Sequence, residues 1–316
     1  MKIIKNYKER EPYFYGKAPY FSRKIKPIES ETYKTIDKNS EEYIKYVYSY
    51  CRNLFTDAFE VNVETNRLQE IVSSNEPALF IMNHTKNQIK DVRAAKFFNT
   101  LLYREYLYSS KGATCPRSRV LANKSVLKNQ PDNGEFYEWL GVRPLKVGFK
   151  SDKEFNRNIL NTLIEEFINK KINLFLFPEG ALTGIPFLPL GWKFQPGAAS
   201  FVKKVLDVID KIKVIPLAFA HSKKHTAIHI GEPVYFKKFE DSYISSSGNS
   251  QNKNFNKYLQ KLFNDRENIF IKNDGVCVNS HEIVPYLSGL MMENLKACMK
   301  SAKEELKNIK PEVYDL

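Results

Sequence analysis

The sequence lacks any long hydrophobic run. No window approaches the roughly 18 apolar residues that a membrane-spanning helix requires. The N-terminal residues MKIIKNYKEREPYFYG also lack the apolar core of about 7–15 residues that is typical of a secretory signal peptide. We therefore expect a cytoplasmic protein, and if it works on a membrane, we expect peripheral contact on the inner face.

Spacings typical of disulfides, redox pairs and metal sites are also missing. The chain has four cysteines, none close to another in the sequence: Cys51, Cys115, Cys277 and Cys298. This pattern indicates reduced thiols in a cytosolic protein. Three histidines recur every fourth residue, at His221, His225 and His229. Because the polar turn SKKHT interrupts them and no acid lies among them, we expect no metal.

The charge is unbalanced, with 49 basic residues against 36 acidic ones and a formal net charge of +13. The chain has no short Arg-rich arm, zinc-finger spacing or aromatic RNA-binding signature, so we expect no nucleic-acid partner. A Lys-rich soluble surface, an anionic membrane and acidic small substrates all remain open. The 316 residues, 42% of them hydrophobic, are sufficient for a sizeable globular core.

From residue 60 onward, short apolar runs alternate with helical periodicity. Three buried strands are predicted, at 77–83, 172–180 and 213–221. Helices at 153–171 and 197–212 precede the second and third of these strands, and 226–236 has the alternation of a further strand. This order predicts an α/β fold, with a mixed, largely parallel twisted sheet that is flanked by helices.

We divide the chain into three parts: an N-terminal arm over 1–59, an α/β core over 60–240 and a C-terminal part over 241–316. The arm ends in an amphipathic helix at 41–59, whose apolar face fits either core packing or contact with lipid. The C-terminal part begins with a Ser/Asn-rich surface loop at 242–254 and ends in a helix at 282–309 that packs on the core.

A histidine ends the first predicted strand. In ALFIMNHTKNQIKDVRAAKFF (78–98), the apolar run stops on Asn83-His84, and Asp91 follows inside a predicted helix. Ligands of open α/β sheets bind at the carboxyl ends of the strands. A neutral imidazole can take a proton from a hydroxyl, and it does so better when a carboxylate fixes its tautomer and ring plane. Alone, His84 also fits a structural histidine.

A second acidic block ends the second strand. In FLFPEG (175–180), Pro178 ends regular ladder pairing and Gly180 permits a tight turn close to a ligand. This places Glu179 on the same rim of the sheet as His84, although a plain turn carboxylate is the alternative. Two further blocks follow: QPGAA (195–199), which opens a helix, and VIPL (214–217), a strand that Pro216 should break.

In this order, the four blocks resemble the pattern of the glycerolipid acyltransferase superfamily, which includes glycerol-3-phosphate and lysophosphatidate acyltransferases. The resemblance covers roughly residues 60–235. It implies transfer of a fatty acyl group from acyl-CoA or acyl-carrier protein to a hydroxyl of a glycerol-phosphate or lysophospholipid acceptor, without a further cofactor. It also implies that His84 is the general base and that Asp91 orients it. Asn83, Glu179 and Gly180 would then bind substrate.

The chain departs from the family pattern at the His–Asp pair. The family has four residues between the two side chains, but here there are six, Thr85 to Lys90. Since seven residues of continuous helix climb about 10.5 Å, a loop or bulge must precede the helix if Asp91 is to reach His84. Asn87 or Gln88 could supply the orienting group instead.

Two other departures concern the phosphate. The chain reads Ala181-Leu182-Thr183 where relatives carry Thr-Arg-Ser, so that arginine is absent. GVRPLKVGFK (141–150) only approximates the second family block; its Arg143, Lys146 and Lys150 are candidates for phosphate contact, or else solvated surface cations. A non-catalytic lipid- or acyl-carrier-binding protein on the same fold is the rival interpretation. A hydrolase is less favoured, because no Gly-x-Ser-x-Gly turn is present.

Overall fold

The computed structural model describes residues 15–17, 32–53, 56–58, 60–63, 65–85, 88–109, 111, 114–124, 135–146, 152–178, 197–222, 225–239, 242–245, 269–272, 275–279 and 283–308. Its helices are η2 (Thr32–Thr35), α2 (Glu41–Asn53), α3 (Thr65–Ser74), α4 (Gln88–Tyr108), α6 (Glu135–Trp139), α7 (Lys153–Lys170), α8 (Gly197–Leu206) and α10 (Ile283–Asn308). Its strands are β1 (Tyr15–Lys17), β2 (Thr56–Ala58), β3 (Glu60–Val63), β4 (Ala78–Met82), β5 (Ser118–Asn123), β6 (Val142–Leu145), β7 (Asn173–Leu176), β8 (Lys211–His221), β9 (His225–Ile230), β10 (Val234–Phe239), β11 (Ser242–Ser245), β12 (Ile269–Lys272) and β13 (Gly275–Asn279).

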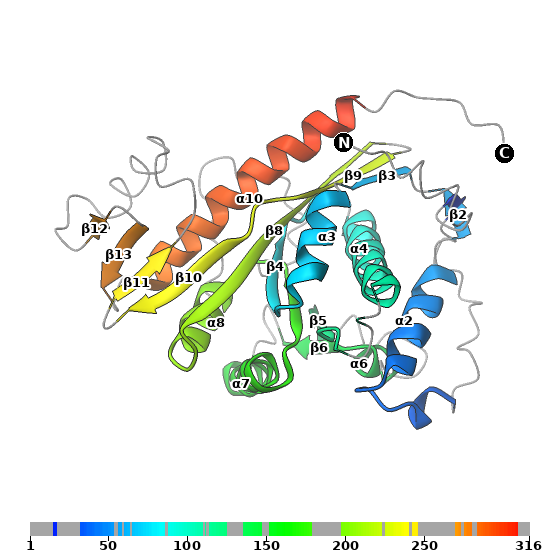
Figure 1. Cartoon of the computed structure of the whole chain (residues 1–316), viewed down its shortest axis with the longest axis horizontal. Helices are drawn as coiled ribbons and strands as arrows, with labels where there is room; N and C mark the ends of the chain where they lie inside the picture. The colour runs from blue at the N-terminus through cyan, green and yellow to red at the C-terminus, as the bar shows by residue number, and fades with distance from the viewer. Residues whose placement is uncertain are drawn as a thin grey trace.

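One mixed sheet forms the centre of the molecule (Figure 1). Its parallel part has the order β6-β5-β7-β4-β8. On the other side of β8, both β9 and β10 pair with it in the antiparallel sense, and β10, β11, β13 and β12 continue as an antiparallel extension. The predicted α/β fold, with a largely parallel sheet flanked by helices, is confirmed.

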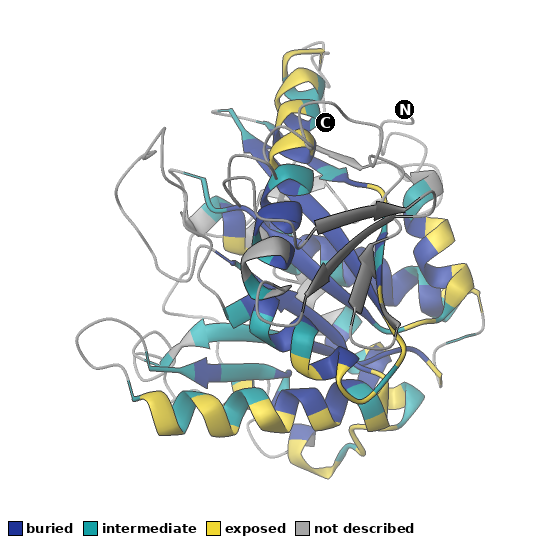
Figure 2. Ribbon diagram, turned by 90° about the vertical axis from the view of Figure 1, so that its left-hand side faces the viewer, coloured by how far each residue is buried: buried dark blue, intermediate teal, exposed yellow. Residues whose placement is uncertain are grey.

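Each face of the sheet has its own core. Successive side chains of β4 point to opposite faces, as a strand requires. Leu79 and Ile81 pack among residues of α7, α8 and α10, whereas Phe80 and Met82 pack among residues of α2, α3 and α4. The central strands are buried, and the exposed residues lie on the outer sides of the helices (Figure 2). Because β4 is buried on both faces, its sequence is a continuous apolar run.

The apolar face of α2 is part of the core. Tyr43, Ile44 and Val47 are buried, and α2 packs against α4. The ring of Tyr43 also meets Trp139 edge-on, with 5.0 Å between ring centroids. Of the two readings left open for this helix, the structure therefore has core packing. The helix ends at Asn53, earlier than predicted, and β2 begins at Thr56.

The segment predicted as one strand over 226–236 is two strands. β9 and β10 are separated at Gly231, whose N–H donates to the carbonyl of Pro216 at 2.8 Å. A Cβ atom on Gly231 would lie 2.2 Å from Sγ of Cys298. The backbone therefore approaches β8 and α10 too closely for a side chain, and a glycine is required there.

The expected break of β8 at Pro216 was wrong, because the strand runs unbroken from Lys211 to His221. The carbonyl of Pro216 points toward Gly231, so its nitrogen faces the same side. On that side, the pairing with β10 ends at Val214 and the pairing with β9 begins at Leu217. The missing N–H falls in the gap between two partner strands, where no ladder bond is needed.

Two other boundaries differ from prediction. The helix predicted over 197–212 ends at Leu206, because Lys211 already begins β8. Ser242–Ser245, predicted as the start of a surface loop, forms β11 between β10 and β13. The many serines of this stretch led to the loop prediction, although the sequence also contains the apolar pair Tyr243 and Ile244. The C-terminal helix is present as α10, which packs on β8, β9 and α8.

Candidate active site

Three neighbouring parallel strands bring side chains together at one rim of the sheet. β8, β4 and β7 lie side by side in that order and run parallel, so their carboxyl ends share one edge. His221 is the last residue of β8, His84 follows the end of β4, and Phe177 directly follows β7. This is the edge at which α/β sheets bind ligands.

Asp91 contacts His84 in spite of the wide spacing. Residues 83–85 are not helical and α4 begins at Gln88, so Asp91 lies in the first turn of α4. Its Oδ2 is 3.4 Å from Nδ1 of His84. Thr85 binds both carboxylate oxygens, with its N–H 2.7 Å from Oδ2 and its hydroxyl 2.8 Å from Oδ1. Asn87 lies outside the described residues, as does the side chain of Gln88.

Asp91 is ionised although it is fully buried. Burial is the largest influence on its pKa and raises it, but the hydrogen bonds from His221, His84 and Thr85 together hold the pKa below its ordinary value. An ionised carboxylate only accepts hydrogen bonds, so Nδ1 of His84 must carry the proton. The lone pair of His84 then lies on Nε2, the atom that a general base needs.

The ring of His84 is held on its edge and on its face. The edge meets Asp91, and the face stacks on Phe177, with 4.0 Å between ring centroids and 9° between ring planes. Within the described part of the chain, Nε2 has no hydrogen-bond partner, and 12% of the side chain is exposed. His84 therefore presents an oriented lone pair on a side chain that is partly exposed.

Sequence reasoning missed two neighbours of the His84–Asp91 pair. His221, considered only as a metal ligand, has its Nε2 2.9 Å from Oδ1 of Asp91. Thr85, which binds both oxygens of the same carboxylate, received no role. The available signal was position: His221 ends a strand that was itself predicted, next to the strand before His84.

Asn83 makes structural hydrogen bonds at this rim, and its contact with substrate stays a prediction. Its side-chain amide donates to the carbonyl of Phe219 at 3.1 Å and accepts from the N–H of Phe219 at 2.7 Å. The backbone pairing of β4 with β8 ends at Met82 and Leu217, and the buried amide of Asn83 continues it. Asn83 therefore fixes the position of the next residue, His84.

The residues Glu179, Gly180 and Lys150, all predicted to bind substrate, lie outside the described residues. Of the Phe-Pro-Glu-Gly block, Phe177 and the buried Pro178 are described. Through Phe177, the block touches His84.

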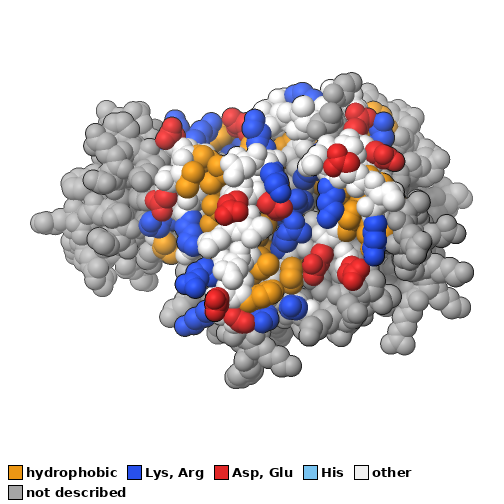
Figure 3. All heavy atoms as spheres, turned by 90° about the horizontal axis from the view of Figure 1, so that it is seen from below, with side chains coloured by type: hydrophobic (Ala, Val, Ile, Leu, Met, Phe, Trp, Pro, Cys, Tyr) orange, Lys and Arg blue, Asp and Glu red, His pale blue; other side chains and the backbone are white. Residues whose placement is uncertain are grey.

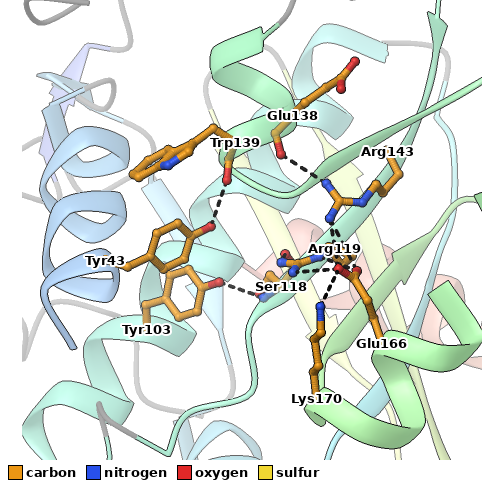
Figure 4. A network of polar contacts seen from close by, with 9 residues as sticks. All are labelled: Tyr43, Tyr103, Ser118, Arg119, Glu138, Trp139, Arg143, Glu166 and Lys170. Carbon is orange, nitrogen blue, oxygen red and sulfur yellow. Dashed lines mark hydrogen bonds and ion pairs between the residues drawn. The ribbon is translucent and has the colours of Figure 1, made fainter. Parts of the chain in front are cut away.

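The predicted phosphate contacts Arg143 and Lys146 already have carboxylate partners. Nη2 of Arg143 is 3.1 Å from Glu166, which also binds Arg119 at 2.7 Å (Figure 4). Nζ of Lys146 is 2.7 Å from Asp152, the N-cap of α7. These ion pairs join β5, β6 and α7, which favours a structural role for both cations.

Glu166 is the acid at the centre of the network in Figure 4. Burial is the largest influence on its pKa and raises it, but the two arginines outweigh burial and hold the pKa below its ordinary value. The group is therefore a carboxylate between two guanidinium groups, which is the arrangement that a buried charge requires.

The periodic histidines do not converge on a common point. His221 binds Asp91, whereas Nδ1 of His229 is 2.7 Å from Glu305 of α10. Within the described ranges, no group of three or more His, Cys, Asp and Glu side chains has the arrangement of a metal site.

The described surface carries charges of both signs. On the face seen in Figure 3, Lys and Arg side chains are interspersed with Asp and Glu side chains and with small apolar areas. No helix in the described ranges combines the length and the apolar character that a bilayer-spanning segment needs.

Comparison with known families gives one match. The model of the family described as Acyltransferase matches residues 60–220, which is just over half of the chain. The matched range contains His84, Asp91 and the Phe-Pro-Glu-Gly block, and it ends one residue before His221. No curated protein sequence matches the chain closely enough to be a relative.

Proposed function

Because the chain belongs to the acyltransferase family of the glycerolipid acyltransferase superfamily, we propose that it moves a fatty acyl group from a thioester to an acceptor hydroxyl with His84 as base. The family supports acyl transfer as the class of reaction. The proposed donor is acyl-CoA or acyl-carrier protein, and the proposed acceptor is a glycerol-phosphate or a lysophospholipid.

The geometry of His84 is the observation that carries this proposal. Its Nδ1 points to the ionised carboxylate of Asp91, and its Nε2 is unengaged among the described residues. In the proposed reaction, Nε2 takes the proton of the acceptor hydroxyl as the oxygen attacks the thioester carbonyl. The C–S bond then breaks, and the imidazolium returns the proton to the leaving thiolate.

This chemistry needs no covalent enzyme intermediate, since a thioester is already activated. A positioned base contributes about 10²–10⁴-fold to such a reaction. The buried carboxylate of Asp91 stabilises the imidazolium that forms on His84, because opposite charges attract strongly where water is excluded.

The acceptor pocket is proposed from the Pro-Glu-Gly block. Phe177 stacks on His84, and this contact supports a position of Glu179 and Gly180 beside the acceptor. For the acceptor phosphate, Lys150 is the remaining candidate, since Arg143 and Lys146 would have to exchange their carboxylate partners. The net charge of +13 suits peripheral contact with an anionic membrane, as well as coenzyme A phosphates or an acidic carrier protein.

The test offers palmitoyl-CoA and acyl-carrier protein to the purified protein with about a dozen hydroxyl acceptors. Release of free thiol measures turnover, and mass spectrometry identifies the acylated product. We expect His84→Ala to abolish both signals while circular dichroism stays unchanged. His229→Ala is the matched control, because His229 bonds to Glu305 away from the rim. A fully active His84→Ala variant would eliminate the proposed base.

A non-catalytic acyl- or lipid-binding protein is the second candidate. The 3.4 Å distance between His84 and Asp91 favours it, because this contact is long for a hydrogen bond to a carboxylate. Catalytic hydrogen bonds are often long before substrate binds, however. Tight acyl-CoA binding without turnover across the whole panel would support this candidate against the enzyme.

A further inference from the structure

Asp91 lies between two imidazoles. Oδ2 faces His84, and Oδ1 faces His221, whose Nε2 is 2.9 Å away. On its other side, Nδ1 of His221 is 2.8 Å from the hydroxyl of Thr226. His221 and Thr226 are opposite each other in the antiparallel pairing of β8 with β9. Four side chains therefore form one hydrogen-bonded row: Thr226, His221, Asp91 and His84.

The row is shielded from water at the end distant from His84. Asp91 is fully buried, Thr226 is 1% exposed, and the side chain of His221 is 5% exposed. Since the carboxylate accepts only, Nε2 of His221 must donate to it. When His221 is neutral, its Nδ1 therefore accepts from the hydroxyl of Thr226. This fixes the tautomer and the ring plane of the second histidine.

We propose that His221 is a positioning residue of the acyltransferase site, which fixes the carboxylate of Asp91 so that the other carboxylate oxygen faces His84. This inference rests on the function proposed above. His221 does not touch the reacting atoms; it acts through Asp91.

The relative lengths of the contacts support this role. The contact of Asp91 with His84 is the longest that its carboxylate makes, at 3.4 Å, so His84 does not itself determine the carboxylate orientation. The terminal torsion of Asp is soft, and shorter contacts must fix it. Thr85 supplies one bond to each oxygen, and His221 supplies the second bond to Oδ1. Without His221, Oδ1 keeps only a hydroxyl that can rotate.

The row also couples the two histidines electrostatically, through the charge of Asp91. A hydrogen bond from His221 disperses part of the negative charge of Asp91 and so weakens its attraction for a proton on His84. Among the described residues, His84 and Asp91 are the titratable groups next to His221 in the row. Nζ of Lys90 in α4 donates to the carbonyl of Ser222, the residue after His221, at 2.5 Å. Loss of the His221 donor should therefore make His84 hold its proton more tightly.

The variants distinguish a positioning role from simple packing. Gln places its amide N–H near the position of Nε2 in His221, so His221→Gln keeps the bond to Asp91. His221→Leu removes every donor. His221→Asn is polar but too short to reach Asp91, and it serves if the Leu variant does not fold. His229→Leu is the control, since it removes an imidazole from the neighbouring strand β9 outside the row.

Two measurements test the proposal. The first is the pH dependence of kcat and kcat/KM for thiol release. We expect His221→Leu and His221→Asn to lower kcat about tenfold and to move the acidic limb of kcat/KM up by about half a pH unit or more. His221→Gln and His229→Leu should remain within about twofold of wild type.

The second measurement does not depend on turnover. The chain has five histidines, so a carbon-detected NMR titration of their ring signals can be assigned by single substitutions. We expect the titration midpoint of His84 to rise in His221→Leu and to return toward wild type in His221→Gln.

The two measurements separate failure of the inference from failure of the proposed function. An inactive wild type, or an active His84→Ala variant, overturns the function, while the NMR titration still decides whether His221 acts on His84. An active wild type that depends on His84, together with unchanged kcat, acidic limb and His84 titration in His221→Leu and His221→Asn, overturns the inference.

Discussion

Replacing Asp91 with Asn gives the sharpest test of the buried carboxylate. The two side chains have nearly the same shape, so the change removes a charge without leaving a cavity. The carboxylate of Asp91 accepts four hydrogen bonds, two on each oxygen. Oδ2 accepts from the backbone N–H of Thr85 and from Nδ1 of His84, and Oδ1 accepts from the hydroxyl of Thr85 and from Nε2 of His221.

The expected loss of stability is small for a change at a fully buried site. The amide oxygen of Asn can take the place of Oδ2 and keep two donors. Its NH₂ group then faces the Thr85 hydroxyl and His221, which can both become acceptors, because the hydroxyl rotates and His221 can change tautomer. What is lost is the charge assistance, and we expect a net cost of about 1–3 kcal/mol.

The expected loss of activity is much larger. A neutral amide cannot stabilise the imidazolium that forms on His84. We therefore expect Asp91→Asn to lower kcat by about 10²–10⁴-fold. Urea unfolding measures the loss of stability, and the rate of thiol release measures the loss of kcat. An Asn variant that keeps full kcat would refute the orienting role of Asp91.

The stability difference between wild type and Asp91→Asn should depend on pH. The pKa of Asp91 is held below its ordinary value by its hydrogen bonds, after they overcome the effect of burial. The carboxylate therefore contributes stability that is present above the unfolded pKa of about 3.9 and is lost as the pH falls through the lower folded pKa. The difference in unfolding free energy between wild type and Asp91→Asn should narrow below about pH 4. A constant difference from pH 7 to pH 3 would contradict this reasoning.

Three further predictions concern the scaffold. Glu166→Gln leaves the buried Arg119 and the half-buried Arg143 with one shared acceptor oxygen, and it should cost about 3 kcal/mol in urea unfolding; a cost below about 1 kcal/mol would contradict a largely buried ion network. Gly231→Ala places a methyl group 2.2 Å from Sγ of Cys298 and should cost about 1–3 kcal/mol, part of which the added Cys298→Ala change should recover. Burial lowers the pKa of Lys213, so its charged form destabilises the fold and the wild type should gain stability as the pH rises toward 10. Lys213→Met should therefore raise the unfolding free energy at pH 7 by about 1 kcal/mol, and this gain should shrink at high pH.

Much of the fold could be predicted because its strands are buried on both faces. The runs around β4 and β7 are short, apolar and bounded by polar residues or Pro178, so their positions follow from local pattern. Pro216 was misread because its effect depends on which neighbour its nitrogen faces. That neighbour is Gly231 at the junction of β9 and β10, and local sequence does not specify it.

The site was predictable where its residues are close in sequence and unpredictable where they meet by pairing. His84 and Asp91 were both identified, and, as the wide spacing requires, residues 83–85 are not helical and α4 begins only at Gln88. The contact of His221 with Asp91 joins residues 130 positions apart. It depends on β8 lying next to β4, and on His221 sharing the sheet face of Phe219 and α4.

The carboxylate partners of the charged candidates could not be predicted for a related reason. Arg143 and Lys146 have the composition of a phosphate site, but a sequence does not show whether a cation already has a partner. Arg143 pairs with Glu166 on α7, which begins only after the motif has ended, and Lys146 pairs with the N-cap residue of the same helix.

The most direct test of the central claim is a structure of the protein with a thioether analogue of acyl-CoA and the acceptor that the activity screen identifies. We expect the acceptor oxygen to lie within about 3 Å of Nε2 of His84, while Nδ1 of His84 stays in contact with Asp91. An acceptor bound away from the rim formed by β8, β4 and β7, with His84 untouched, would contradict it.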